Sequence, residues 1–417
     1  MEHNGEKLAS SYGIGLFSIT LLSQWIAGNV LFTGIEGFFK FGIVGALAFS
    51  LAGFFSFNTL IPIVRRTAKQ SDSFSLLDIL STRLTPNSFY WMKWLLLAGH
   101  CFNLALTLYA GGILLYAFSI PIPIGMLLFF ITGLFMVVFL KWKWFTGYSM
   151  LKVGLLFLMM IMLLIHSYLL NGIQVIYDGI RLYHPYLLFF NWESLPALFL
   201  AFWCVFFGSL LTDIRTWELC LRYNDAKKGL GLLATGFLWS TIPFSMAIIA
   251  LSAIYLSGFD SVLDVFYRLF TRYDHWAANF ILVLVFLMIL MGALFSNLKT
   301  FFFVYKRPQQ QWNKSGSAIV VLFTSLMFLL VKLFSSISIL DLFVLFGVFF
   351  AACAPAICHL LMNKTKQGLI PVFIILIAAL CGWILYFNGF YQYSVISSFS
   401  LSVLLTGLQW IYIKTSA

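Results

Sequence analysis

The chain has 417 residues, of which 62% are hydrophobic and only 9% are charged, and its mean hydropathy is +0.97. A soluble globular domain carries about a quarter of charged residues, so this composition indicates an integral membrane protein. The formal net charge is +11, but the basic residues fall in short stretches between apolar runs. This distribution excludes a nucleic-acid-binding module, which would carry a basic stripe.

Apolar runs recur along the whole chain, and each is close to the length that crosses a bilayer as a helix. Alternation with a period of two is weak, which argues against a barrel. We therefore expect an all-α integral membrane protein with about twelve transmembrane helices in a single polytopic domain over residues 1–417. The expected spans are 12–35, 42–63, 90–118, 122–140, 147–170, 192–212, 229–257, 277–305, 317–336, 340–361, 368–388 and 394–413.

The loops between these spans differ in their basic residues. One side carries most of the lysines and arginines, for example Arg65, Arg83 and Arg222, whereas the other keeps few, such as Lys40 and Arg181. Because cytoplasmic loops are enriched in these residues, both termini are predicted to be cytoplasmic, in a plasma (inner) membrane. The segment Ser75–Pro86 has apolar residues at helical spacing and is predicted to lie along the membrane surface.

The first and sixth spans both carry residues that interrupt helices. The first contains GNVLFTGIEG (Gly28–Gly37), and the sixth contains Pro196 and FFGSLLTD (Phe206–Asp213). The two enter the membrane from opposite sides, which an inverted-topology repeat of five plus five helices requires. A second interpretation stays open here, in which the glycines only allow helices to pack closely.

Five stretches in chain order resemble the sodium/solute symporter family. They are FTGIEGFFKFG (Phe32–Gly42), LYAGGILL (Leu108–Leu115), WELCLRYNDAKKG (Trp217–Gly229), GALFSNLKT (Gly292–Thr300) and APAICHLLMNKTKQG (Ala354–Gly368). The resemblance implies a LeuT-type fold with broken helices one and six. It also implies two inverted repeats, 12–170 and 192–361, and two additional helices over 368–413. The implied function is symport of a small polar organic solute by alternating access.

The resemblance also implies a sodium site between the first and eighth spans. Its ligands would be the carbonyls of Gln24, Ala27 and Ala293 and the side chains of Ser296 and Asn297. Oxygen ligands of this kind suit a dehydrated cation. Alternatively, the last two side chains bond the preceding helical turn or a neighbouring helix.

Three departures from the family pattern leave the coupling ion open between sodium, protons and none. FTGYSMLK (Phe145–Lys152) lacks the Asp and Gln of many members, Glu36 stands where Pro is common, and Lys299 stands where many have Asp. The ammonium of Lys299 leans back towards Ser296, where it would substitute for the ion or carry a proton. The alternative is that it snorkels to the cytoplasmic interface. His100 is a second candidate proton carrier.

Polar and aromatic residues near the two interruptions are the candidate solute-binding residues, with core packing or gating as the alternative. His100 shares one helical stripe with two of them. The candidates are Asn29, Asn103, Thr107, Trp203, Phe207 and Ser209. Glu36 is expected either as a vestibule carboxylate or in a solvated loop. The group from Arg215 to Asp225 is expected to form a solvated salt-bridged face or an inner gate.

The sequence therefore predicts a secondary active transporter that imports its solute. The alternative is a transporter-derived sensor or scaffold that binds solute without moving it. Motifs of phosphate-binding loops, metalloproteases and hydrolases are absent, so an enzyme is not expected. The expected partners are a small-molecule solute and membrane lipid, without nucleic acid. No cofactor is expected apart from the possible sodium ion, and the oligomeric state is left open.

Overall fold

The computed structural model describes residues 13–416, apart from short gaps at 71–72, 74, 140–142, 224–227, 256–257, 260, 272–274 and 364 and a long gap at 306–337. Within these residues the regular elements are helices, and the one isolated β-bridge joins Leu84 to Gln367. This confirms the all-α class predicted from the sequence.

The helices follow the predicted spans closely. In chain order they are α2 (Ile14–Trp25), η1 (Asn29–Thr33), α3 (Gly34–Phe41), α4 (Ile43–Gln70), α5 (Leu76–Arg83), α6 (Pro86–Tyr116), α7 (Ile122–Phe139), α8 (Lys143–Asn171), α9 (Ile173–Tyr183), η2 (Pro185–Leu188), α10 (Leu195–Thr212), α11 (Ile214–Arg222), α12 (Lys228–Leu251), α13 (Val262–Phe270), α14 (Trp276–Tyr305), α16 (Ile339–Met362), α17 (Ile370–Phe387) and α18 (Tyr391–Ser416).

Nine helices in the described residues are long and apolar enough to cross a membrane. The first predicted span would be a tenth, with α2 bent by 77° from the stretch that ends in α3. The fourth predicted span is the shorter apolar helix α7. The predicted span 317–336 lies outside the described residues.

The first interruption begins directly after Trp25. Ile26 leaves the helical region with ψ 90°, and after Gly28 the chain continues as the π-helical turn η1. Gly28 lies so close to α6 that a β-carbon there would be 2.2 Å from Ala110 Cβ and 2.8 Å from Leu106 O. Only glycine allows the broken segment to approach α6 this closely.

The sixth span is interrupted at its far end. α10 ends at Thr212, and Asp213 adopts an extended conformation before α11 begins. The Asp213 side chain accepts a hydrogen bond from the Thr216 N–H at 3.0 Å, which caps the N-terminus of α11. The interruption of the first span is therefore confirmed. α10 runs unbroken through Pro196 and as far as Thr212, so the second interruption lies at the end of the sixth span rather than within it.

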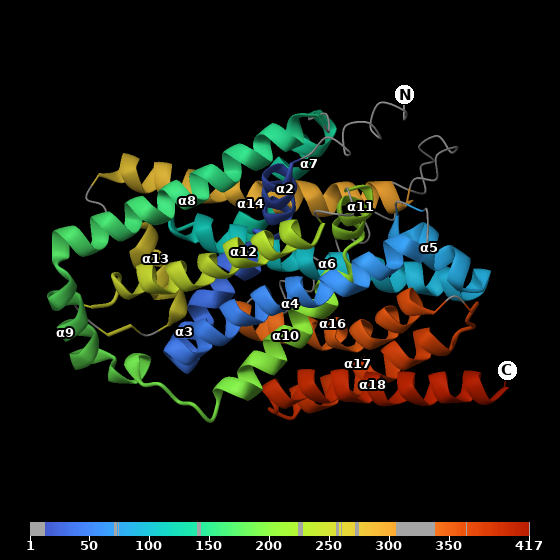
Figure 1. Ribbon diagram of the computed structural model, residues 1–417. Coiled ribbons are helices and arrows are strands. Elements are labelled where there is room, and N and C mark those ends of the chain that lie inside the picture. The colour runs from blue at the N-terminus through green and yellow to red at the C-terminus, as the bar shows by residue number, and fades with distance from the viewer. Residues whose placement is uncertain are drawn as a thin grey trace.

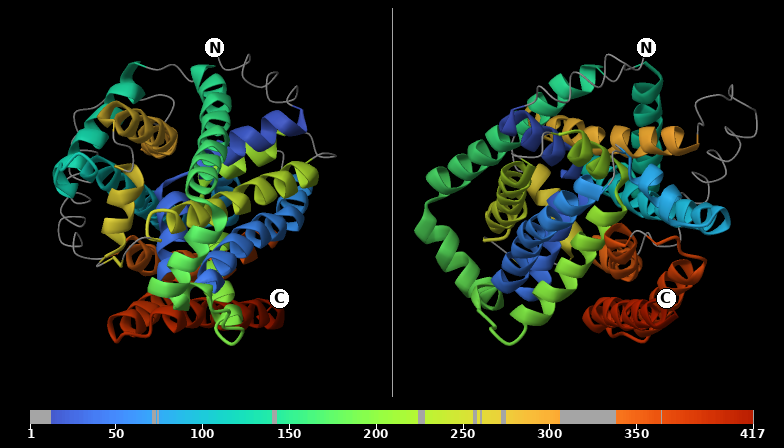
Figure 2. Two further views of the ribbon diagram at one scale, coloured as in Figure 1. Left: turned by 90° about the vertical axis from the view of Figure 1, so that its left-hand side faces the viewer. Right: turned by 45° about the vertical axis from the view of Figure 1, so that its right-hand side comes forward.

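Elements that connect the spans gather at the two ends of the bundle (Figure 1). α5 and α11 lie at one end, called the basic end here because it holds Arg83 and Arg222, whereas α9 and α13 lie at the other, called the opposite end. α4 packs against α10 and α12, and α16 packs against α10 and α18. α17 and α18 lie together along one side of the bundle (Figure 2).

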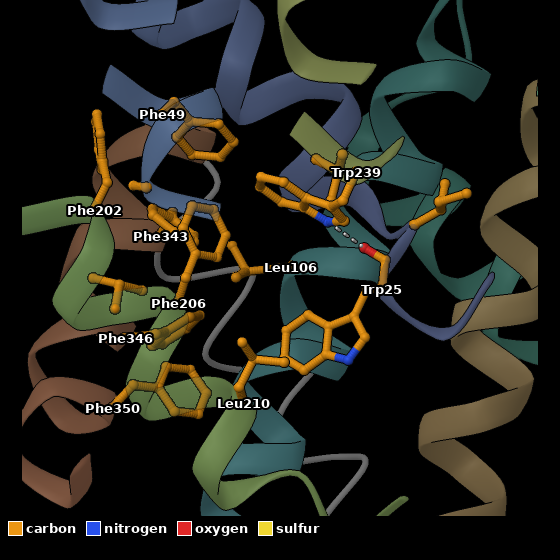
Figure 3. Packing of buried hydrophobic residues seen from close by; sticks show 14 of the residues in the cluster. Trp25, Phe49, Leu106, Phe202, Phe206, Leu210, Trp239, Phe343, Phe346 and Phe350 are labelled. Atoms are coloured by element: carbon orange, nitrogen blue, oxygen red, sulfur yellow. Dashed lines mark hydrogen bonds between the residues drawn. The ribbon is translucent and has the colours of Figure 1, made fainter. Parts of the chain in front are cut away.

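The core between α4, α10, α12 and α16 is filled by aromatic rings (Figure 3). Phe49 lies edge-on to Phe206, with centroids 4.9 Å apart, and Phe206 in turn lies 4.7 Å from Trp239. Phe343 contacts Phe49 at 5.5 Å. These rings hold α10 in position next to the first interruption, because they pack against α4 and α12 on one side and α16 on the other.

Candidate functional site

A hydrogen bond joins the two interrupted helices. The indole Nε1 of Trp25, the last residue of α2, donates to Thr216 Oγ1 in the first turn of α11 at 2.8 Å. Thr216 Oγ1 donates in turn to Asp213 Oδ2 at 2.5 Å. Trp239 Nε1 of α12 donates to the carbonyl of Trp25 at 3.3 Å, as Figure 3 shows. The two breaks are thus linked through side chains that are buried or nearly so.

The side chains around this link are apolar. Leu106 of α6 and Leu210 of α10 lie beside the indole of Trp25, with Phe206 next to them and Phe346 and Phe350 further along α16 (Figure 3). All of these residues are buried. The link between the two breaks is therefore surrounded by aromatic and aliphatic side chains.

The candidate solute-binding residues do not share one wall. Thr107 of α6 is buried, and its hydroxyl donates to the Asn103 carbonyl at 2.8 Å. Trp203 stacks on Phe207 at 5.2 Å and donates from Nε1 to Thr59 of α4 at 3.2 Å.

Trp203 also lies 5.7 Å from Phe399 of α18, so it faces α4 and α18 rather than α6. The Ser209 hydroxyl donates within α10, to the Phe206 carbonyl at 3.0 Å. Asn29 opens η1, and its side chain lies outside the described part of the chain. A solute-binding role for these residues stays a prediction.

Two of the candidate ion ligands have other partners in the structure. Ser296 Oγ accepts a hydrogen bond from Arg215 Nη1 at 2.6 Å, and both residues are buried. The carbonyl of Ala27 accepts the N–H of Val30 at 3.1 Å. Gln24 Oε1 is buried and has no hydrogen-bond partner among the described residues. Ala293 is buried within α14.

His100 lies in a polar cluster with two of the candidate ion ligands. Its Nε2 is 3.8 Å from Asp213 Oδ1, and its ring interacts with the side chain of Asn297 and the charge of Arg215. With the bond from Arg215 to Ser296, these residues connect α6, the break of the sixth span and α14. The structure therefore brings His100 of α6 close to Ser296 and Asn297 of α14, a proximity that sequence spacing did not reveal.

Lys299 is half-buried on α14. Its ammonium lies 4.7 Å from the centroid of the Phe295 ring, one turn earlier on the same helix. This geometry is a cation–π contact. Its role as a coupling residue stays a prediction.

A different lysine reaches the first interruption. Lys152 of α8 is only 2% exposed, and its Nζ donates to the carbonyls of Ser23 at 2.7 Å and Ile26 at 3.0 Å. Lys152 is the last residue of the stretch Phe145–Lys152, and no role was predicted for it from the sequence. The signal was present, because an ionisable residue inside an apolar span is a functional candidate by default.

At the opposite end, α3 is fastened to the start of α16. Glu36 is 6% exposed, and its Oε2 accepts the Leu340 N–H at 2.8 Å. One turn further, Lys40 forms an ion pair with Asp341 at 2.8 Å. The expectation of a solvated loop position for Glu36 was wrong, because η1 and α3 continue the helix through this residue and direct its carboxylate at a helix N-terminus.

At the basic end, Arg83 of α5 terminates α16. Its Nη1 donates to the carbonyls of Leu360, Leu361 and Asn363 at 2.9, 2.8 and 2.6 Å. Burial lowers the pKa of the Arg83 guanidinium, but arginine still keeps its charge. The expected solvated face after α10 is only partly present, because Arg215 points into the core and is 7% exposed.

Comparison with solved structures identifies similar folds, although the sequence matches no protein-family model and no curated protein. One neighbour is a Na⁺-coupled sialic acid symporter in a substrate-bound outward-open state, with a TM-score of 0.71 and 12% identity over 96% of this chain and 90% of that chain. The chain has the LeuT-type transporter fold.

Two further neighbours share this fold. The nucleobase-cation-symport-1 family transporter Mhp1 gives a TM-score of 0.58 at 11% identity, covering 98% of this chain and 94% of its own. A manganese transporter of Eremococcus coleocola gives 0.51 at 12% identity, covering 95% of this chain and 94% of its own. All three are transporters, and the LeuT-type fold together with the apolar spans makes this chain an integral membrane protein.

Proposed function

We propose that the protein is a secondary transporter that moves a small organic solute across the membrane by alternating access. The observation that carries the proposal is the bond between Trp25 and Thr216, which ties the two interrupted helices to each other next to their breaks. In transporters built from inverted repeats, solute and ion sites lie where two such helices meet.

Contacts at each end of the bundle hold that end closed. In alternating access the two ends would open one at a time. The basic end is closed by the bonds from Trp25 to Thr216 and from Arg215 to Ser296. The opposite end is closed by the hydrogen bond between Glu36 and Leu340. It is also closed by the edge-to-face contact of Phe32 of η1 with Phe266 of α13, whose ring centroids are 4.7 Å apart. With both termini cytoplasmic, as the basic loops predict, the basic end faces the cytoplasm and the solute is imported.

The surroundings of Trp25 bear on the class of solute. A small polar solute was expected from the sequence, but Leu106, Phe206 and Leu210 line this region with apolar surface. We therefore favour organic solutes with an aromatic or aliphatic portion over sugars, because an apolar wall gives a purely polar molecule no partners for its lost water contacts.

The same apolar packing is what a sensor or scaffold derived from a transporter would show. Such a protein would bind a solute without moving it. Counterflow in liposomes separates the two functions, because binding alone produces no exchange of labelled solute across the membrane.

The test uses the purified protein in liposomes with a panel of labelled solutes. The panel contains sialic acid, a hydantoin and Mn²⁺, after the three structural neighbours, together with proline, phenylalanine and tryptophan. We expect counterflow of at least one organic member above protein-free liposomes. Exchange should be lost in Gly28→Val, because any side chain there overlaps Ala110 and Leu106, and retained in Gly147→Ala, where a β-carbon meets nothing within 4 Å.

Counterflow of no member of the panel, together with a melting temperature that rises with one of them, would favour the sensor. Equal exchange by the wild type and Gly28→Val would show that the close approach of Gly28 to α6 is not needed for exchange.

A further inference from the structure

The break after α2 removes the helical partners of two buried carbonyls. In a continuous helix the Ser23 carbonyl would accept the N–H of Ala27, and the Ile26 carbonyl that of Val30. Instead Ala27 N–H bonds the Trp25 carbonyl at 3.1 Å and Val30 N–H bonds the Ala27 carbonyl at 3.1 Å. Unpaired carbonyls at the C-terminal end of a helix carry partial negative charge and attract a cation or a strong donor.

The side chain of Lys152 fills this role. Its Nζ lies 2.7 Å from Ser23 O and 3.0 Å from Ile26 O, with the whole side chain buried between α2 and α8. These two contacts are neutral oxygens, as in the coordination of an alkali ion, rather than the carboxylate of an ordinary ion pair. The ammonium therefore occupies the kind of position that a small monovalent cation takes at a broken helix.

α14 forms another wall of this position. A β-carbon at Gly292 would lie only 3.0 Å from Lys152 Nζ, so glycine leaves room for the ammonium. Ser296 is one turn further on the same face of α14, and there the guanidinium of Arg215 donates to its hydroxyl at 2.6 Å. Two cations supplied by the chain thus lie along the stripe of α14 where the sequence predicted sodium ligands.

This arrangement does not fit a sodium ion at the same position. The ion would have to share the Ser23 and Ile26 carbonyls with an ammonium, and Ser296 with a guanidinium, at distances where like charges repel strongly in a buried site. Two further side-chain oxygens of α2, Ser23 Oγ and Gln24 Oε1, are buried and have no hydrogen-bond partner of their own among the described residues.

We propose that Lys152 is a built-in cation that replaces the coupling sodium between α2, α8 and α14, and that the protein consequently works without sodium. A role of Lys152 in coupling rests on the transporter function proposed above. Its occupancy of the cation position does not. The lysine would hold α2 against α8 through carbonyls that a dissociable ion otherwise bridges. Among the lysines, Lys152 rather than Lys299 then carries this role.

The experiment measures the melting temperature of the purified protein at equal ionic strength in sodium chloride and in choline chloride. The wild type should show no difference. Lys152→Ala should melt lower than the wild type in choline and recover by about 2–4 °C in sodium, because the freed carbonyls and the unpartnered oxygens can then hold the ion. Lys152→Ser is a second small variant, in case the alanine variant does not fold. Lys152→Met removes the charge but fills the space, so it should not respond to sodium.

Lys299→Ala separates this proposal from the alternative raised by the sequence, and Lys69→Ala is a control at an exposed position. Neither should gain a response to sodium. The proposal is overturned if sodium stabilises the wild type in a saturable manner, if both small variants at position 152 are indifferent to sodium, or if Lys299→Ala alone gains the response. Recovery of folding of a position 152 variant only in sodium supports it.

These measurements need no solute. Melting temperatures that contradict the cation proposal would therefore not contradict the transport proposal, which the counterflow assay tests. Absence of counterflow, in turn, would not contradict the occupancy of the cation position by Lys152.

Discussion

The carboxylate of Glu36 lies 2.8 Å from the backbone N–H of Leu340 and thereby fastens α3 to the first turn of α16. Glu36 belongs to the part of the first span beyond its break, and Leu340 to a helix that packs against both α10 and α18. An acidic group at a helix N-terminus is satisfied by free N–H groups and by the helix dipole. The opposite end of the molecule is therefore closed by a directed polar contact, next to the ion pair of Lys40 with Asp341.

We expect Glu36→Leu to lower the free energy of unfolding by about 1–3 kcal/mol, because it leaves the Leu340 N–H buried and unpaired. Glu36→Gln should lose less, since the amide oxygen can still accept. Denaturation of the purified protein in detergent measures both. Lys40→Met is a useful comparison, because the Lys40 side chain is 40% exposed and its pair with Asp341 should contribute about 0–1 kcal/mol. A Glu36→Leu protein as stable as the wild type would show that the contact does not close this end.

Arg83 is expected to determine where α16 ends. Its Nη1 reaches three carbonyls from Leu360 to Asn363. Arg83→Met keeps the stem but removes every donor, and it should destabilise the protein by about 1–3 kcal/mol. Arg83→Lys should recover part of the loss, since one ammonium reaches fewer of the carbonyls. Equal stability of the methionine variant and the wild type would contradict this account.

The link between the two breaks can be isolated by a double-mutant cycle. Trp25→Phe removes the indole donor and Thr216→Val removes its acceptor. If the bond is formed, the effects of the two changes should fail to add by about 0.5–1.5 kcal/mol. Strictly additive effects on the free energy of unfolding would show that the residues do not interact. Thr216→Val also removes the hydrogen bond from the Thr216 hydroxyl to Asp213. The cycle is therefore repeated in a protein that carries Asp213→Asn.

Close packing of α10 on α16 depends on Gly208. A β-carbon there would lie 1.9 Å from the Phe350 carbonyl oxygen, which is backbone and cannot move aside without separating the helices. Gly208→Ala should therefore destabilise the protein by about 1–3 kcal/mol or more. Gly154→Ala on α8 is the matched control, since a β-carbon there meets nothing within 4 Å. Similar melting temperatures for the two variants would contradict the packing described.

Hydropathy was enough to find most of the helices, because the bilayer requires long apolar runs whatever their neighbours are. The interruption at Gly28 and the end of α10 at Asp213 were also predictable, since glycines and polar residues are unusual inside a span. Both features depend on local sequence alone. The span expected at 317–336 lies outside the described residues and stays a prediction.

The contacts of the site depend on how the helices are rotated about their axes, which hydropathy does not reveal. Trp203 and Phe207 lie on a face of α10 that meets α4 and α18, and an apolar face that meets protein looks the same in sequence as one that meets lipid. In the sequence, Lys152 and Arg215 are two of many charged residues. Only the fold brings Lys152 into contact with α2 and Arg215 into contact with α14. Attention to intramembrane charges would have selected Lys152, but not its two carbonyl partners.

The most direct test of the whole account is counterflow by wild-type protein in liposomes that contain choline on both sides in place of sodium. If Lys152 takes the place of the sodium ion during alternating access, the protein should exchange an organic solute of the panel equally well in choline and in sodium. Exchange confined to sodium would contradict the built-in cation. Exchange of no solute in either buffer would contradict the transporter.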